Sequence, residues 1–155
     1  MNNTIITLAI AFAAVSAQAA DTRAAAATVT KALTCEIADG KAAAVVKAVK
    51  ALGAKPGKDE NDYVLASPIT VFGIDVTRIN VTPSDGEGPD SYVAIFANAK
   101  PADIATAAQL KPLAGGNRCA GKCEGPFIRD TKTGRLAADV RDRTDVWLTC
   151  TPTQP

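Results

Sequence analysis

Three carboxylates within six residues form the clearest constellation for metal chemistry. Residues 85–90 read Asp-Gly-Glu-Gly-Pro-Asp, so Asp85, Glu87 and Asp90 share a short loop with two glycines. Oxygen ligands on a flexible loop suit Ca²⁺. The alternate acidic positions and the closing Glu of an EF-hand are missing, and a solvated hairpin tip would have the same composition. Ca²⁺ is therefore a candidate ligand for these three residues.

Four cysteines are the second group that could do chemistry: Cys35, Cys119, Cys123 and Cys150. An even number of cysteines in an exported chain predicts disulfides, here two, with three possible pairings. The strand order described below favours Cys119–Cys123 together with Cys35–Cys150. The C-x3-C spacing departs from zinc knuckles and from the C-x-x-C redox motif, so zinc binding and thiol exchange are weaker alternatives.

Histidine is absent from the chain, and this removes whole classes of enzyme. Ser-His-Asp and Cys-His mechanisms and His-ligated metals all need an imidazole. The nucleophile-elbow, S-x-x-K, dinucleotide-binding and Walker motifs are also missing. We expect neither catalytic residues nor a cofactor. A net charge of +1, from 17 Lys+Arg and 16 Asp+Glu, gives no reason to expect nucleic-acid binding.

Residues 1–19 predict a secretory signal peptide. An apolar run of eleven residues, Ile5 to Val15, is followed by the small-x-small pattern of Ala17 and Ala19. The run is too short to span a hydrocarbon core of about 30 Å as a helix. We therefore expect cleavage near Ala19 and a periplasmic or secreted protein with no membrane span in the mature chain.

The mature chain is expected to hold a single domain. Residues 20–34 form an Ala-rich lead-in, and residues 35–155 form the domain. Within the lead-in, residues 20–27 are expected to be poorly ordered or a frayed helix, and residues 28–35 show no clear preference. A first helix is predicted over Lys41–Leu52, with Asp39 as its N-cap and Gly53 just beyond its end. A second helix is predicted over Pro101–Leu110, because proline suits the first helical position.

The first of these helices has one apolar face, formed by alanine and valine. Lys47 and Lys50 lie opposite this face, and Lys41 lies at the start of the helix. This pattern is typical of a helix packed on the core with a solvated lysine face.

Alternating and apolar segments predict six strands. They cover Tyr63–Ala66, Ile74–Thr82, Ser91–Ala97, Phe127–Asp130, Arg135–Arg141 and Val146–Cys150. The apolar positions change phase between Val76 and Ile79, which predicts a β-bulge or a register break. The fold class is α+β: an antiparallel sheet of about six strands in the order α-βββ-α-βββ, with both helices on one face and two disulfides. This order hints at a duplicated unit, although no residue-level repeat supports it.

An apolar turn and a single tryptophan offer the best candidates for partner docking: Tyr63, Val71, Phe72, Ile74 and Trp147. The favoured function is a small exported, non-enzymatic binding module, protein-binding or inhibitor-like. Its partner would be another envelope or extracellular protein. A small-ligand or Ca²⁺ carrier is the alternative, and an envelope enzyme using carboxylates or thiols is the third possibility.

Overall fold

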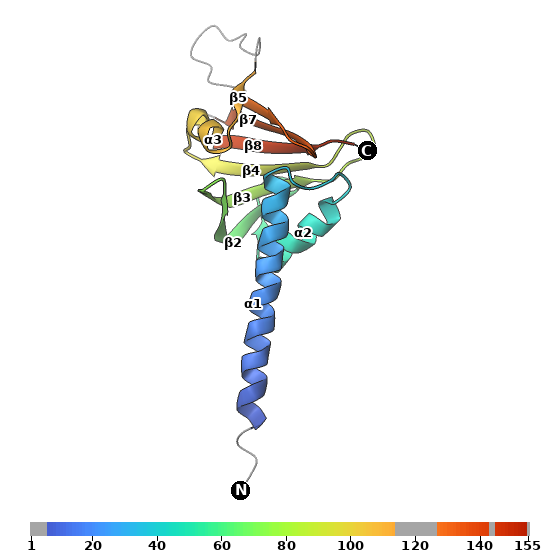
Figure 1. Ribbon diagram of the computed structural model, residues 1–155, viewed down its shortest axis with the longest axis vertical. Coiled ribbons are helices and arrows are strands. Elements are labelled where there is room, and N and C mark those ends of the chain that lie inside the picture. The colour runs from blue at the N-terminus through green and yellow to red at the C-terminus, as the bar shows by residue number, and fades with distance from the viewer. Residues whose placement is uncertain (1–5, 114–126, 143–144, 155) are drawn as a thin grey trace.

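The computed structural model describes residues 6–113, 127–142 and 145–154, with side chains from residue 19 onward except those of residues 141 and 142. In this part of the chain, eight strands form one antiparallel sheet in the order β1-β2-β3-β4-β8-β7-β6-β5 (Figure 1). The strands are β1 Lys55–Pro56, β2 Asp62–Val71, β3 Ile74–Thr82, β4 Ser91–Ala97, β5 Lys111–Pro112, β6 Phe127–Asp130, β7 Gly134–Asp142 and β8 Asp145–Pro152. The helices are α1 Ile6–Leu33, α2 Ala42–Ala51 and α3 Pro101–Ala107. The predicted α+β class with an antiparallel sheet is confirmed.

The described residues form eight strands instead of the expected six or so, and the two additional strands are short and lie at the edges of the sheet. β1 pairs with β2 only at Lys55 and Pro56, and β5 pairs with β6 only at Lys111 and Pro112. A strand of two residues carries no alternation that a sequence pattern could reveal. Both edge strands are Lys-Pro dipeptides, and both residue types are used in proteins to end a sheet.

All three helices pack on the same face of the sheet. α1 contacts β2, β4 and β8, α2 contacts β3, and α3 contacts β6, β7 and β8. Figure 1 shows α1 crossing in front of the sheet, with its N-terminal half projecting beyond the body of the molecule. The side chains between the helices and the sheet form one hydrophobic core.

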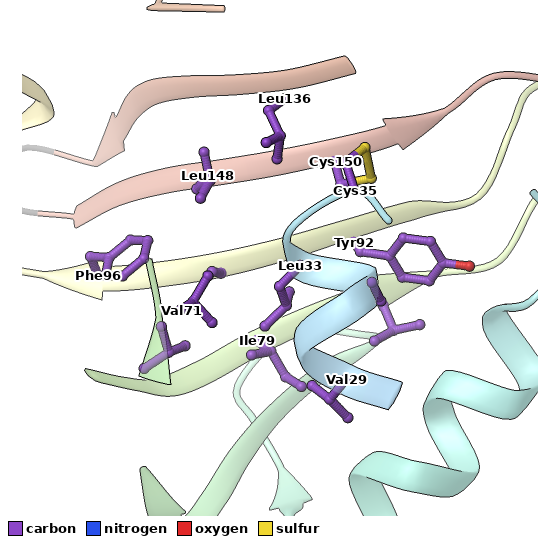
Figure 2. Close-up of a cluster of buried hydrophobic side chains, with 14 of the residues drawn as sticks. Val29, Leu33, Cys35, Val71, Ile79, Tyr92, Phe96, Leu136, Leu148 and Cys150 are labelled. Carbon is purple, nitrogen blue, oxygen red and sulfur yellow. A yellow bond between two sulfur atoms is a disulfide. The ribbon is translucent and has the colours of Figure 1, made fainter. Parts of the chain in front are cut away.

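Of the two states expected for residues 20–27, poorly ordered or helical, the structure has a helix, which continues through the segment left open by the sequence to Leu33. With α1 the described residues form three helices instead of the expected two. Its buried residues Ala25, Val29, Ala32 and Leu33 have the spacing of one helical face. Figure 2 shows Val29 and Leu33 facing core residues of the sheet. The core therefore begins before Cys35, within a segment whose many alanines hide the apolar period.

A disulfide between Cys35 and Cys150 joins the loop after α1 to the central strand β8. This is one of the two bridges favoured by the sequence. Cys119 and Cys123 lie outside the described residues, so their pairing stays a prediction. The sequence separation of 115 residues makes the bridge long-range, and the chain-entropy model gives such a loop a stabilisation of roughly 4–5 kcal/mol.

The phase change in β3 coincides with a register shift against β2. The pairing passes from Val64↔Arg78 to Ile69↔Val76, so the strand pair is irregular at this point. As a result Val76 and Ile79, three residues apart, are both fully buried on the helix side. The predicted register break is confirmed.

The strand order is symmetric about the central pair of β4 and β8. Each half consists of a helix, a two-residue edge strand and three longer strands. The unit that recurs in this strand order is a helix with four strands, where the sequence suggested a helix with three strands, and no residue-level repeat accompanies it.

The helices α2 and α3 also end in the same backbone motif. The N–H groups of Gly53 and Ala54 donate to the carbonyls of Lys50 and Val49, and Gln109 and Leu110 repeat this with Thr106 and Ala105. Gly53 and Gln109 both have positive φ, of 73° and 55°. This is the pattern of a Schellman C-cap, in which glycine is favoured.

Replacing Gln109 by glycine is expected to stabilise the protein by about 0.5–1 kcal/mol. Relief of the left-handed conformation outweighs the extra freedom that glycine gives the unfolded chain. The matched change Gly53→Gln is expected to destabilise by about 1–2 kcal/mol, because residues with a side chain rarely adopt its φ of 73°. Urea unfolding of both variants checks the pair, and a Gln109→Gly variant less stable than the parent would contradict the assignment.

Candidate functional site

The sheet face opposite the helices, here called the open face, is covered by no helix of the described chain. Two rows of side chains cross it through the central strands. Their members, in register, are Arg78, Ile95, Trp147 and Asp139 in one row, and Asn80, Val93, Thr149 and Ala137 in the other. Each row takes one residue from each of β3, β4, β8 and β7.

The middle of the open face is apolar. An antiparallel sheet with one solvated side normally alternates apolar and polar residues along each strand. β4 does not, because Val93 and Ile95 on the open face are apolar like Tyr92, Ala94 and Phe96 on the helix side. Val93 is 4% exposed and Ile95 is 2% exposed. The centre of the sheet is therefore shielded from solvent on this side by a cover that no described helix supplies.

An ion pair across β4 supplies part of this cover. The Nη1 atom of Arg78 on β3 lies 2.8 Å from the Oδ2 atom of Asp145 on β8. Since β4 lies between these two strands, the Arg78 side chain must cross it, next to its register partner Ile95. The side chain of Arg78 is 39% exposed and that of Asp145 is 15% exposed. The result is a charged, partly solvated cover over an apolar strand, with the partly buried Trp147 beside it.

The residues that the sequence singled out for docking do not form one surface. Val71 is fully buried, and Tyr63, Phe72 and Ile74 pack partly buried against the core on the helix side. Trp147 alternates along β8 with the buried Val146 and Leu148, so it belongs to the open face. The two parts of the expected patch therefore lie on opposite faces of the sheet.

Phe72 has a structural role in the β2–β3 turn. With φ of 52° it shares a two-residue left-handed turn with Gly73, whose φ is 80°. The guanidinium carbon of Arg129 on β6 lies 5.4 Å from the centroid of the Phe72 ring. This is within the range of a cation–π contact, which fastens the turn to the second half of the sheet.

The Asp90 carboxylate, one of the three Ca²⁺ candidates, is 2% exposed and fully occupied by hydrogen bonds. The backbone N–H groups of Lys41 and Ala42 donate to its Oδ2 atom at 2.8 and 3.0 Å. The backbone N–H of Ser84 donates to its Oδ1 atom at 3.0 Å, and the Tyr92 hydroxyl donates to Oδ2 at 2.8 Å. Asp90 therefore caps the N-terminus of α2 from a distant loop.

The other two carboxylates of this loop do not join Asp90. Asp85 is exposed and accepts a hydrogen bond from the backbone N–H of Glu87 at 3.0 Å. Among the described residues, no three Asp, Glu, Cys or His side chains are grouped to hold a metal ion. The structure thus does not assemble the calcium site that the loop composition suggested.

The cap of α2 corrects a second expectation. Asp39, expected as the N-cap, accepts a hydrogen bond from the backbone N–H of Asp90 at 2.8 Å instead. The residue preceding the helix is Lys41, whose side chain makes no capping bond. Gly40, with φ of 74°, turns the chain between Asp39 and the helix. Asp39 and Asp90 together therefore bind the β3–β4 loop to the start of α2.

Burial acts to raise the pKa of Asp90, but the hydrogen bonds from Ser84, Tyr92, Ala42 and Lys41 outweigh it and hold the pKa below the ordinary value of 3.8. The pKa of the Tyr92 hydroxyl is raised by its own burial and by the neighbouring carboxylate. The pair is therefore an ionised carboxylate and a neutral phenol.

Replacing Asp90 by asparagine is expected to destabilise the protein by about 1.5–3 kcal/mol at pH 7, because the backbone donors lose a charged acceptor. Since the folded-state pKa lies below 3.8, this stabilisation is present above about pH 4 and is lost as the pH falls through the folded-state pKa. Urea unfolding between pH 2.5 and 7 measures both effects. The control Asp85→Asn is expected to stay within about 0.5 kcal/mol of the parent. Equal stability of the two variants would contradict the capping role.

Arg78, Val93 and Ile95 were not among the residues predicted from the sequence to form a binding surface. One feature of the sequence did point to an apolar surface on both sides of the sheet. The Ser91–Ala97 segment is apolar in both phases, which indicates a central strand with an apolar outer face. The side of β4 on which the helices pack could not be read from that pattern.

Comparisons of the chain with protein-family models, with curated proteins and with solved structures find no match.

Proposed function

We propose that this protein is a small exported, non-enzymatic module that binds another protein of the envelope or the exterior through its open face. The supporting observation is that no described helix covers this face, whose centre presents the partly exposed Trp147 and the Arg78–Asp145 ion pair above the buried side chains of Val93 and Ile95. Tryptophan and arginine are the residue types most enriched in the energetic centres of protein interfaces.

The edges of the sheet favour docking on the face over addition of a strand. A partner that extends a sheet needs a row of free backbone N–H and C=O groups. The edge strands β1 and β5 are two residues long, and each contains a proline that lacks an N–H group. Pro68, in the irregular part of β2, interrupts the donors of the next strand as well.

Export is proposed on the signal-like sequence of residues 1–19 and on the position of the core. Residues 19–24 are all exposed, and the first buried side chain described in α1 is Ala25. Cleavage after Ala19 therefore leaves every described buried residue in the mature chain. The Cys35–Cys150 disulfide suits an oxidising compartment.

None of the described helices has the combination of length and hydropathy needed to cross a membrane.

The exported protein is expected to begin at Ala20. Expression of the full chain with its own leader, followed by intact-mass measurement of the periplasmic or secreted product, checks this. An Ala19→Arg variant is expected to accumulate unprocessed, because the small residue before the cleavage point is lost. A mature product that retains residues 1–19 would contradict the assignment.

Photo-crosslinking tests the open face directly. A benzoylphenylalanine at Thr149 is expected to capture a protein in the envelope or medium, because this residue lies in the middle of the open face. The matched control places the same group at Thr106, which is exposed on α3 on the helix side. The same captured protein at both positions, or none at Thr149, would overturn the proposal. Loss of the Thr149 product in an Arg78→Ala variant would locate the contact.

A further inference from the structure

A run of lysines without acidic neighbours forms a second surface of distinct chemistry. Residues 41–57 contain four lysines and no aspartate or glutamate. The four are Lys41, Lys47, Lys50 and Lys55, and all are exposed. They are called the lysine surface below.

The packing of α2 fixes the direction of these charges. Its buried residues are Ala42, Val45, Ala48 and Val49. Lys47 and Lys50 therefore point away from the core, about 5–6 Å apart at their Cβ atoms, as i and i+3 neighbours are. A helix of ten residues is about 15 Å long, and Lys55 follows on the adjoining edge strand. Lys55 is in register with Val64, whose partner Arg78 lies on the open face, so it belongs to the open-face side of that edge. The lysine surface therefore comprises the exposed side of α2 and the adjoining edge of the sheet.

No acidic side chain of the described chain neutralises this area at ion-pair distance. The ion pairs of the described residues, Arg78–Asp145 and Arg135–Asp130, both use arginine. Two acidic residues that flank residues 41–57 have other hydrogen-bond partners. Asp39 accepts a hydrogen bond from the backbone N–H of Asp90, and the buried Asp62 accepts one from the Asn80 side chain. Exposed acids, Glu36, Asp59 and Glu60, lie beyond the two ends of the run.

We infer that the lysine surface binds a protein segment rich in aspartate and glutamate. Positive charge on one partner pairs with negative charge on the other and speeds their encounter. A membrane surface fits less well, because an interfacial helix inserts its apolar face into the lipid, and Val45 and Val49 are already buried in the core. A phosphate polymer also fits less well, because arginine, the residue suited to bidentate phosphate recognition, is absent from the run.

This inference adds to the proposed function a second binding surface on the protein and a negative charge on its partner. It does not depend on binding at the open face. The lysine surface lies on α2 and the edge of the sheet, and it touches the open face only where Lys55 pairs with Val64.

The test uses a fluorescein-labelled decamer of glutamate and the mature protein at 20 mM salt, with binding measured by anisotropy. The triple variant Lys47→Gln, Lys50→Gln, Lys55→Gln is expected to bind about tenfold more weakly, as the sum of three exposed charge contacts. The control variant Lys100→Gln, Lys111→Gln, Lys132→Gln removes the same charge from exposed sites elsewhere. It is expected to stay within about twofold of the parent, and affinity is expected to fall steeply with salt.

Three outcomes would overturn the inference: no binding of the decamer, equal losses in the two triple variants, or binding of phosphatidylglycerol vesicles in place of the peptide. Circular dichroism and urea unfolding show whether each variant remains folded. Crosslinking at Thr149 in the lysine variant separates the two proposals. A retained crosslink with lost peptide binding supports both, and a retained crosslink with unchanged peptide binding overturns only the lysine surface.

Discussion

The helices α1 and α2 pack on the sheet mainly through small side chains, which limits the hydrophobic energy that holds them there. The buried residues of α2 are alanine and valine, and α1 adds only Leu33 to the same types. Apolar burial stabilises in proportion to area, at about 25 cal/mol per Å², so each alanine contributes little. Two specific links, a disulfide and a buried carboxylate, add to the limited hydrophobic stabilisation of α1 and α2. The Cys35–Cys150 disulfide holds the end of α1 to β8, and the Asp90 carboxylate holds the start of α2 to the β3–β4 loop.

The regular part of the fold could be predicted from the sequence, because local periodicity encodes it. β3, β4 and β6 have the bounds that alternation and turn residues indicate, and the phase change after Val76 marks the register shift. The expected strand order favoured the Cys35–Cys150 bridge over the other pairings without requiring it. A helix was one of two expectations for the start of the mature chain, but the packing of α1 on the core could not be predicted, since alanine occupies both buried and exposed positions and leaves no contrast between them.

The features that escaped prediction depend on contacts between distant residues. Asp90 caps a helix that begins 48 residues earlier, and a local capping motif therefore pointed to Asp39. The docking residues were chosen because they are apolar, but the face on which each lies is set by register. Trp147 and Phe72 are on opposite sides of the sheet, because the helices cover the side of Val146 and Leu148. Only the three-dimensional pairing of Arg78 with Asp145 reveals the cover over β4.

The two proposed surfaces are joined by the register of the sheet. Lys55 pairs with Val64, Val64 with Arg78, and Arg78 with Ile95. Val64 is 43% exposed, one of the few large apolar side chains exposed in the described chain. One row of side chains therefore runs from the lysine surface, over an exposed valine, to the ion pair that crosses β4. A partner that places carboxylates against Lys55 would bring its next residues over Val64 and Arg78. The two proposed contacts would therefore meet along this one row of side chains.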